Sequence, residues 1–358
     1  MSSALIAMSG GVDSSVAALL ALKQGLNCVG AMMKLFQNEE SEANCNKTCC
    51  SLEDANDARS VAFKLGIPFH VFNFMDYFKI NVIDRFINSY QSGETPNPCI
   101  ECNRYLKFDK LLKRAHELHL DYLITGHYAR IQYNKGSNRY LLKKGVDASK
   151  DQSYVLYMMT QYQLEHTLFP LGNLTKKEVR EIAVENGFIN AKKHESQDIC
   201  FVPSGNYAEF IKKHSNQNNS LKPGSFMDIH GNIIGEHKGI IHYTIGQRKG
   251  LGISSENSLY VCKINADDNS ITIGNENSLY SKTILAKNIN LIPMDRLNSP
   301  IKVTAKLRYK QPEQPATLHQ LDENTLRAEF ETPQRAVTKG QAVVFYDGDI
   351  VIGGGTIA

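Results

Sequence analysis

The chain has 358 residues, 42% of them hydrophobic and 22% charged, and its formal net charge at pH 7 is +3. These values are typical of an ordinary globular protein, and so small a net charge does not by itself indicate a nucleic-acid partner. Because no apolar run reaches the roughly 20 residues of a membrane span and nothing resembles a signal peptide, we predict a cytoplasmic protein without a membrane partner.

The first two hundred residues alternate short apolar runs with helical patterns. The apolar runs predict strands over residues 4–8, 28–33, 69–74 and 122–125, and the helical patterns cover residues 16–23, 52–65, 77–89 and 103–118. This alternation predicts an α/β domain built on a parallel sheet. Loops that follow the strands of such a sheet meet at one edge, where ligands usually bind.

The loop after the first predicted strand reads Ser9-Gly10-Gly11-Val12-Asp13-Ser14-Ser15. Its two glycines allow a tight turn that gathers consecutive N–H groups, and the next helix directs its positive N-terminus at the same point. We therefore predict a phosphate-binding loop rather than a simple serine-capped turn. The loop lacks the lysine of the G-x-x-x-x-G-K-[ST] pattern, so its mechanics differ from those of ordinary γ-phosphoryl transfer.

The later part of the chain predicts a hairpin and then an all-β region. Residues 129–133 and 140–144 form the expected hairpin, and a helix begins after Thr175 and closes at Gly187. Residues 215–220 are polar and predict a linker, beyond which short alternating strands indicate β structure. We expect an α/β domain over 1–215, a small central β module over 216–286 and a C-terminal β-barrel over 287–358.

Eight cysteines without a secretory signal favour reactive or metal-binding thiols over a disulfide scaffold. Cys99 and Cys102 form a C-x-x-C on a loop stiffened by two prolines, just before the helix expected to begin near residue 103. A helix N-terminus lowers the pKa of a thiol, so we predict that Cys102 is reactive. Taken alone, Cys200 is most simply a buried structural cysteine. We interpret the remaining loop cysteines as incidental, namely Cys45, Cys49 and Cys50.

Several ordered motifs together resemble the tRNA-specific 2-thiouridylase (MnmA) family of PP-loop ATP pyrophosphatases. They are the S-G-G-x-D-S loop, P-N-P-C-x-x-C-N-x-x-x-K-F ending at Phe108, and residues 125–130, 150–154, 196–201, 246–252 and 339–343. The resemblance covers the whole chain and implies a tRNA sulfurtransferase. Such an enzyme uses ATP and Mg²⁺ to adenylate the C2 oxygen of the wobble uridine, and sulfur then displaces AMP to give 2-thiouridine.

The resemblance also assigns roles by position. Cys200 would hold the incoming sulfur as a persulfide, and Cys102 would free it while a Cys102–Cys200 disulfide forms. Asp13 would help to place Mg²⁺, and the partners would be tRNA and an upstream persulfide donor or carrier protein. The implied ATP contacts are Ala7, Met8, Ser9, Gly10, Gly11, Val12, Asp13, Ser14, Met33 and Gly126. The implied tRNA contacts are Asn97, Pro98, Cys99, His127, Lys150, Asp151, Gln152, Arg308, Tyr309 and Gln341.

One position departs from a common pattern of the family, in which the first cysteine of the C-x-x-C is an aspartate. The departure leaves open an iron–sulfur cluster held by Cys99, Cys102 and Cys200, with one iron available for sulfur. Two further alternatives are a PP-loop synthetase that activates a small carboxylate or base for ammonia, and a zinc- or cluster-binding RNA module with a structural C-x-x-C. The first would not need paired cysteines, and the second would not need Cys200.

Overall fold

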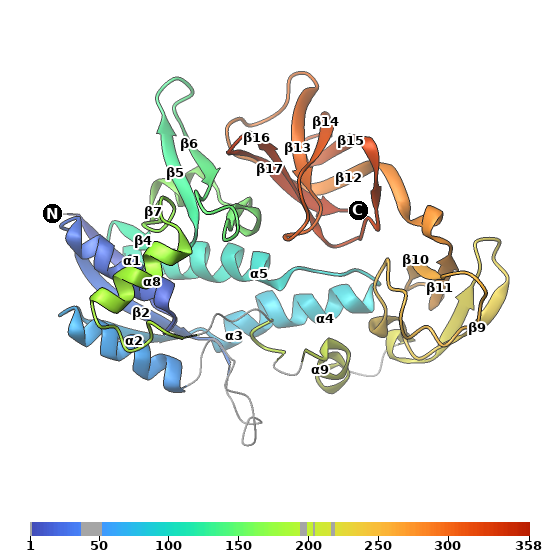
Figure 1. Cartoon of the computed structure of the whole chain (residues 1–358), viewed down its shortest axis with the longest axis horizontal. Coiled ribbons are helices and arrows are strands. Elements are labelled where there is room, and N and C mark those ends of the chain that lie inside the picture. The colour runs from blue at the N-terminus through green and yellow to red at the C-terminus, as the bar shows by residue number, and fades with distance from the viewer. Residues whose placement is uncertain (1, 37–51, 194–198, 203–204, 216–218) are drawn as a thin grey trace. The chain divides into compact units, whose positions relative to one another are not determined.

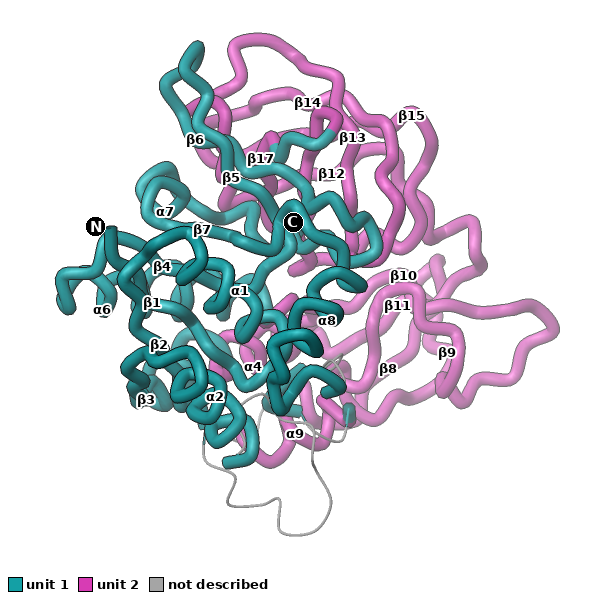
Figure 2. Tube along the Cα trace, turned by 60° about the vertical axis from the view of Figure 1, so that its left-hand side comes forward, with its two compact units in different colours: residues 1–82, 99–205, 349–351 teal, residues 83–98, 206–348, 352–358 magenta. Residues whose placement is uncertain are grey.

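The computed structural model describes residues 2–36, 52–193, 199–202, 205–215 and 219–358. Residue contacts divide the chain into two units, residues 1–82, 99–205 and 349–351, and residues 83–98, 206–348 and 352–358 (Figure 2). The three loop cysteines interpreted as incidental, Cys45, Cys49 and Cys50, lie outside the described residues. Within the described part of the chain, every helix is too short or too polar to cross a bilayer.

A parallel sheet with the strand order β3-β2-β1-β4-β7 forms the centre of the first unit. Its strands are β1 (Ser3–Ala7), β2 (Asn27–Lys34), β3 (Phe69–Asn73), β4 (Tyr122–Ile124) and β7 (Thr167–Leu168). The strands predicted from the apolar runs are confirmed to within one residue at each end. The order changes direction between β1 and β4, so the loops that follow these two strands lie at the switch point where parallel sheets bind ligands.

Helices α1 (Val12–Lys23), α2 (Leu52–Lys64) and α8 (Lys176–Glu185) pack on this sheet, and α1 and α8 lie side by side (Figure 1). One apolar cluster joins them to the strands, with fully buried residues that include Ile6, Val16, Ala58 and Val179. Thr175 caps α8 as predicted: its hydroxyl accepts from the N–H of Glu178, whose carboxylate accepts from the N–H of Thr175.

The helix expected over residues 103–118 begins earlier than predicted. It runs as α5 (Pro98–Glu101), a π-helical segment (Cys102–Leu111) and α6 (Leu112–Glu117). Proline fits the first turn of a helix because its fixed φ is helical and its missing N–H has no intrahelical partner there. The C-x-x-C therefore lies inside the helix and not on a loop. Asn103, where the helix was expected to begin, lies inside it, is buried and donates to the carbonyl of Val155.

The helix expected over residues 77–89 is also interrupted. It becomes α3 (Met75–Phe78) and a π-helical segment (Lys79–Ile83), followed by α4 (Asp84–Gln91). The predicted hairpin is confirmed as β5 (Ala129–Asn134) and β6 (Arg139–Lys144), with Ala129 opposite Lys144 and Asn134 opposite Arg139. Two short helices complete the α-helical elements of the described residues, α7 (Gln161–Glu165) and α9 (Tyr207–His214).

The second unit contains the all-β region predicted after residue 221. A small sheet has the order β10-β11-β8-β9, from β8 (Gly224–Met227), β9 (Ile233–His237), β10 (Tyr260–Asn265) and β11 (Ser270–Gly274). Its core includes Phe226, Val261 and Ile271, each fully buried. This central β module precedes a larger barrel.

The barrel strands pair in the order β12-β15-β14-β13-β16-β17, and a β12–β17 pairing closes the ring. They are β12 (Tyr280–Leu291), β13 (Ile301–Lys306), β14 (Gln314–Asp322), β15 (Thr325–Arg335), β16 (Ala342–Asp347) and β17 (Ile350–Ile357). The domain boundary predicted at residue 286 falls inside β12, which is a barrel strand throughout. Asn288 there has φ +51 and lies where the register with β17 shifts, so β12 continues through the predicted boundary with a bulge.

Candidate active site

The phosphate loop lies between β1 and α1, and serine hydroxyls fix its shape. Ser14 and Ser15 donate to the carbonyl of Gly11 at 3.0 and 3.1 Å, and the N–H of Ser9 donates to the Ser14 hydroxyl at 3.2 Å. Helix α1 begins at Val12, earlier than the predicted residue 16. The first N–H groups of a helix have no intrahelical acceptor, so this loop presents them to a ligand at the switch point of the sheet.

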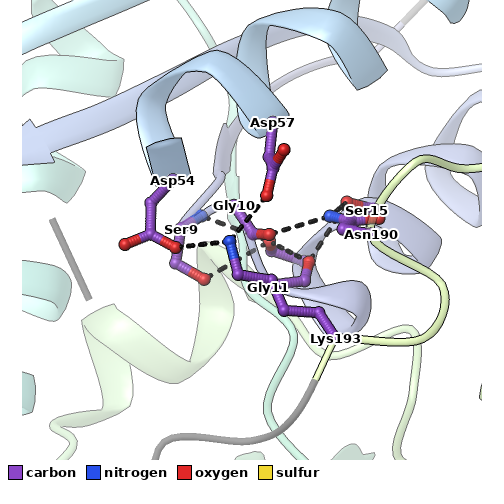
Figure 3. Close-up of polar contacts among 9 residues, drawn as sticks. Ser9, Gly10, Gly11, Ser15, Asp54, Asp57, Asn190 and Lys193 are labelled. Carbon is purple, nitrogen blue, oxygen red and sulfur yellow. Dashed lines mark hydrogen bonds and ion pairs between the residues drawn. The ribbon is translucent and has the colours of Figure 1, made fainter. Parts of the chain in front are cut away.

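Polar side chains from α2 and from residues 190–193 surround the loop (Figure 3). Gly10 has φ +76, and a Cβ there would lie 2.4 Å from the carbonyl oxygen of Asp54. Lys193 binds Asp54 at 2.8 Å and Asp57 at 2.6 Å, and the amide of Asn190 donates to the carbonyl of Gly10 at 2.8 Å. Burial opposes the charge of Lys193, but the hydrogen bonds to the two carboxylates outweigh it and raise its pKa.

Asp13 carries the negative charge of the loop and has two close partners. Both of its carboxylate oxygens accept from the ammonium of Lys176, at 2.7 and 2.8 Å, and one accepts from the hydroxyl of Tyr128 at 2.7 Å. A single carboxylate together with substrate phosphates is the usual way in which proteins hold Mg²⁺. The oxygen chemistry of Asp13 therefore fits a magnesium ion, provided that the carboxylate can exchange Lys176 for it.

The segment after β4 contacts the phosphate loop and also the helix that carries Cys102. Gly126 abuts the loop so closely that a Cβ would lie 2.8 Å from the backbone of Asp13. Nδ1 of His127 lies 2.6 Å from the hydroxyl of Thr125. Its Nε2 lies 3.4 Å from the ammonium of Lys107, a residue of the π-helical segment. An ammonium only donates, so Nε2 of His127 accepts and Nδ1 carries the proton. Burial, and then the Lys107 charge, hold the pKa of His127 well below its usual range.

The described thiols differ in exposure. Cys99 is exposed, Cys102 and Cys200 are half-buried, and Cys28 is buried in the core. Burial raises the pKa of Cys28 to about 11, which makes it unreactive at neutral pH. Among the described residues, no three His, Cys, Asp or Glu side chains lie close enough together to hold a metal ion. The structure therefore does not gather Cys99, Cys102 and Cys200 as cluster ligands.

Helix α3 contacts both segments that carry the candidate thiols. The ring of Phe78 packs edge-on at 5.7 Å against Phe201, which directly follows the second thiol. The hydroxyl of Tyr77 donates at 3.1 Å to Asp109, in the π-helical segment that begins at the first thiol. One short helix thus positions two segments that are about a hundred residues apart in the sequence.

Several of the implied tRNA contacts in the first unit have internal partners. Asp151 is buried and accepts from the N–H and the hydroxyl of Ser153. Gln152 pairs with the backbone of Tyr128 in both directions, at 2.9 and 3.0 Å. His127 is also buried. These residues position Tyr128 and the phosphate loop, and their contact with RNA, like that of Lys150, stays a prediction.

In the second unit, the barrel turn at residues 339–341 holds the segment that leads to the C-x-x-C. The amide of Gln341 donates to the carbonyl of Thr95 at 2.6 Å, and the N–H of Thr95 donates to the carbonyl of Lys339 at 2.9 Å. Gly340 has φ +83, and a Cβ there would lie 2.8 Å from Glu94. The chain runs from this contact directly into Asn97-Pro98, two further residues predicted to meet tRNA.

Arg308 and Tyr309 follow β13 in the barrel. The guanidinium of Arg308 donates to the carbonyl of Ala336 at 3.1 Å and to the hydroxyl of Thr338 at 2.9 Å, and the side chain of Tyr309 is exposed. Arg308 thus braces the turn that contacts Thr95. Contact of either residue with tRNA stays a prediction.

Three polar residues of the site were not predicted from the sequence. Lys176 and Asn190 bind the phosphate loop through their side chains, and Lys193 binds the α2 carboxylates of Asp54 and Asp57 beside it. Only the helix cap at Thr175 drew attention to Lys176, and nothing in its local pattern distinguished it from the solvent-exposed Lys177. Its partner Asp13 is 163 positions away in the sequence, so this contact depends on how α1 and α8 pack.

The chain matches three protein-family models in succession. Residues 2–204 match a tRNA methyl transferase HUP domain, residues 208–275 a tRNA methyl transferase PRC-barrel domain, and residues 281–357 an aminomethyltransferase β-barrel domain. Among solved structures, a complex of a 4-thiouridine synthetase with RNA and bound ATP is similar at 20% identity, with a TM-score of 0.38. The match covers 59% of this chain and 50% of that one.

Two curated relatives match almost end to end. The tRNA-specific 2-thiouridylase MnmA of Acetivibrio thermocellus is 51% identical over 354 residues, which cover 99% of this chain and 98% of that protein. The tRNA-specific 2-thiouridylase MnmA of Clostridioides difficile is 51% identical over 353 residues, covering 99% and 97%. The chain therefore belongs to the tRNA-specific 2-thiouridylase family of PP-loop enzymes, as its motifs indicated.

Proposed function

We propose that this chain replaces the C2 oxygen of the wobble uridine of tRNA by sulfur, using ATP and Mg²⁺, and releases AMP and pyrophosphate. The observation that carries the proposal is the connection between the phosphate loop and the thiol-bearing helix. Tyr128 binds Asp13 of the loop, and its neighbour His127 binds Lys107 of the helix that carries Cys102. Nucleotide chemistry and thiol chemistry therefore share one structural support.

In the first step the uridine C2 oxygen attacks the α-phosphorus of ATP, and the bond to the pyrophosphate oxygen breaks. The N–H groups at the start of α1 would bind the phosphates, with Asp13 directed to the metal. The backbone at Met33, at the end of β2, and Gly126 would contact the rest of the nucleotide. The product is a uridine whose C2 carries AMP as a leaving group.

In the second step the terminal sulfur of a persulfide on Cys200 attacks C2, and AMP leaves with the former uridine oxygen. The thiolate of Cys102 then attacks the Cys200 sulfur, which breaks the S–S bond and leaves the transferred sulfur on the base. The two cysteines end as a disulfide, so a dithiol reductant must return two electrons before the next cycle. The persulfide itself would come from an upstream donor or carrier protein. We propose that the reaction takes place in the cytoplasm.

The test is formation of 2-thiouridine, measured by nucleoside mass spectrometry on unmodified tRNA with ATP, Mg²⁺ and a persulfide donor. We expect Cys102→Ala and Cys200→Ala each to lower the rate by more than about a hundredfold, because each removes a nucleophile of the sulfur relay. Pyrophosphate release in the first turnover should persist in both variants, because adenylation precedes sulfur transfer. Cys262→Ala, in β10 of the central β module, is the matched control and should retain activity.

Other products would contradict the proposal. An added methyl group in place of a sulfur-for-oxygen exchange would favour the methyl transfer named by the family models. Activity of Cys200→Ala with a persulfide donor would favour an RNA module with a structural C-x-x-C. A visible absorption band of the oxygen-free protein, lost with Cys99→Ala, would restore the cluster route, for which the described residues do not assemble ligands.

A further inference from the structure

A buried lysine from another helix faces the acid of the phosphate loop. Lys176 is the first residue of α8, its side chain is 10% exposed, and its ammonium lies within 2.8 Å of both carboxylate oxygens of Asp13. The same ammonium lies 5.8 Å from the centre of the Tyr128 ring. A positive charge is therefore held on the first turn of α1, beside the N–H groups that the loop presents.

This position is electrostatically unfavourable for a lysine. The N-terminus of a helix carries about half a positive charge, which disfavours a cation in the first turn of α8. Burial adds a desolvation penalty, and a buried ion pair is often no more stable than apolar side chains of the same volume. Lysine at position 176 thus departs from the preference for uncharged or acidic residues at the start of a helix. Proteins depart from such preferences mainly at functional sites.

The backbone of Lys176 is held in place by hydrogen bonds separate from those of its ammonium. Its N–H donates to Asp147 at 2.9 Å, and the reciprocal cap between Thr175 and Glu178 fixes the start of the helix. A lysine ends in a compact point charge on a flexible four-carbon stem. The ammonium can therefore pass from one acceptor to another without displacing α8.

We propose that Lys176 is the cation that binds the ATP phosphates over the phosphate loop, and that Asp13 holds it in place until the nucleotide arrives. The loop contains no lysine of its own, so α8 supplies the full positive charge that its N–H groups lack. On nucleotide binding the carboxylate of Asp13 would hold the magnesium ion, and the ammonium of Lys176 would donate to a phosphate oxygen.

This inference rests on the proposed function, because it assigns the cation of the adenylation step. When the bond between the α-phosphorus and the bridging oxygen breaks, the electron pair stays on pyrophosphate. Lys176 neutralises the new charge and keeps its own proton throughout. A preformed charge at the leaving group stabilises the transition state more than the ground state, so it accelerates the step.

The test measures binding of Mg-ATP, and of pyrophosphate without magnesium, to the full chain by titration calorimetry in the absence of tRNA. We expect Lys176→Met to weaken both by at least about tenfold, as for loss of a charge-assisted hydrogen bond, and Lys176→Arg to retain most of the affinity. Lys177→Met is the matched control, because its side chain is 86% exposed and lies 3.7 Å from Glu181, away from the loop. Affinities of Lys176→Met within twofold of the unchanged protein would overturn the proposal.

A second pair of variants separates phosphate binding from simple neutralisation of Asp13. With Asp13→Asn the lysine loses its internal anion, so pyrophosphate without magnesium should bind more tightly. Adding Lys176→Met to Asp13→Asn should then remove at least about tenfold in affinity. If Lys176 only neutralised Asp13, the second substitution would change nothing. This double variant leaves neither charge buried without its partner, so it remains testable even if Lys176→Met alone unfolds.

The two hypotheses fail separately. Suppose that Lys176→Met binds pyrophosphate weakly but the unchanged protein forms no 2-thiouridine. That result would support this inference and contradict the proposed function. Normal phosphate binding by Lys176→Met, in a chain that thiolates tRNA, would contradict this inference and support the function.

Discussion

Gly10 shows how one residue of the phosphate loop is fixed by space as well as by conformation. Its φ of +76 is shared by Gly25, at φ +80 after the end of α1. A Cβ at Gly10 would lie 2.4 Å from the Asp54 carbonyl, whereas a Cβ at Gly25 would meet nothing within 4 Å. The two positions therefore separate the conformational strain of a side chain from its steric strain.

We expect Gly25→Ala to lower the free energy of unfolding by about 1 kcal/mol, for the left-handed backbone alone. Gly10→Ala should add roughly 1 to 3 kcal/mol, because the loop or α2 must shift to admit the methyl group. It should also weaken Mg-ATP binding by at least about tenfold, which Gly25→Ala should not. Urea unfolding and calorimetry measure the two effects. Equal results for the two variants would mean that Asp54 does not constrain the loop.

The residues of the site differ in whether the sequence could predict them. Ser9, Gly10 and Asp13 were predictable because a phosphate loop is a local structure, fixed by neighbours in the sequence. Lys176 and Lys193 were not, because Lys176 reaches Asp13 and Lys193 reaches the α2 carboxylates only after α8 and the residues beyond it pack on α1 and α2. A lysine that binds a buried carboxylate and one exposed to solvent look alike in a sequence.

Among the elements, the thiol-bearing helix departs most from its prediction. The periodic residues after position 103 indicated a helix, but Pro98 extends it to include Cys99 and Cys102. Proline was interpreted as stiffening a loop, although it is equally suited to the first turn of a helix. The strands β1, β2 and β4 were easier to predict, because each contains an apolar run that is largely buried.

A further element-scale prediction concerns the barrel turn that holds Thr95. Gln341→Ala removes the donor to the Thr95 carbonyl and should loosen the segment that leads to the C-x-x-C. We expect amide hydrogen exchange at Thr95 to accelerate by about tenfold in the tRNA-free protein, as for the loss of about one hydrogen bond. Gln320→Ala is the control, because that amide donates at 2.6 Å to Asp322 within its own strand, β14. Unchanged exchange at Thr95 would show that this hydrogen bond does not hold the segment in place.

At the scale of the whole molecule, the sequence predicted the order of fold types along the chain. It did not predict that a segment near the C-terminus belongs to the first unit. Residues 349–351 belong to the first unit, although the residues around them belong to the second. There Arg130 forms a 2.8 Å ion pair with Asp349, and Ile350 pairs with Lys143 of the hairpin. Such contacts join positions more than 200 residues apart, and no local pattern in the sequence encodes them.

Both units contain a buried histidine that folding keeps neutral. Burial lowers the pKa of His127 in the first unit and of His237 in the second. Nε2 of His237 lies 3.0 Å from the carbonyl of Asn269, to which it donates. Nδ1 accepts from the N–H of Gly239. A second proton on either ring would break an accepting contact, so protonation opposes the folded state in each unit.

The lowered pKa values of the two histidines set the direction in which stability changes with pH. Below the ordinary histidine pKa of about 6.5 the unfolded chain binds a proton that the folded chain does not, so stability falls as the pH falls. Each histidine should lower the free energy of unfolding by about 1.4 kcal/mol for each pH unit, from about pH 6.5 down to its pKa in the folded state. Carboxylates with lowered pKa, such as Asp147 and Asp349, contribute only below about pH 4.

Hydrogen exchange between pH 7 and pH 5 can follow the two units separately. His237→Gln should reduce the pH-dependent loss of protection in the central β module, where burial lowers the pKa of His242 as well, and should leave that of the parallel sheet around His127 unchanged. His230→Gln, at an exposed position of the same module, should leave both losses in place. If His237→Gln instead left the pH dependence of its own module intact, the buried imidazole would not be the group that acid titrates there.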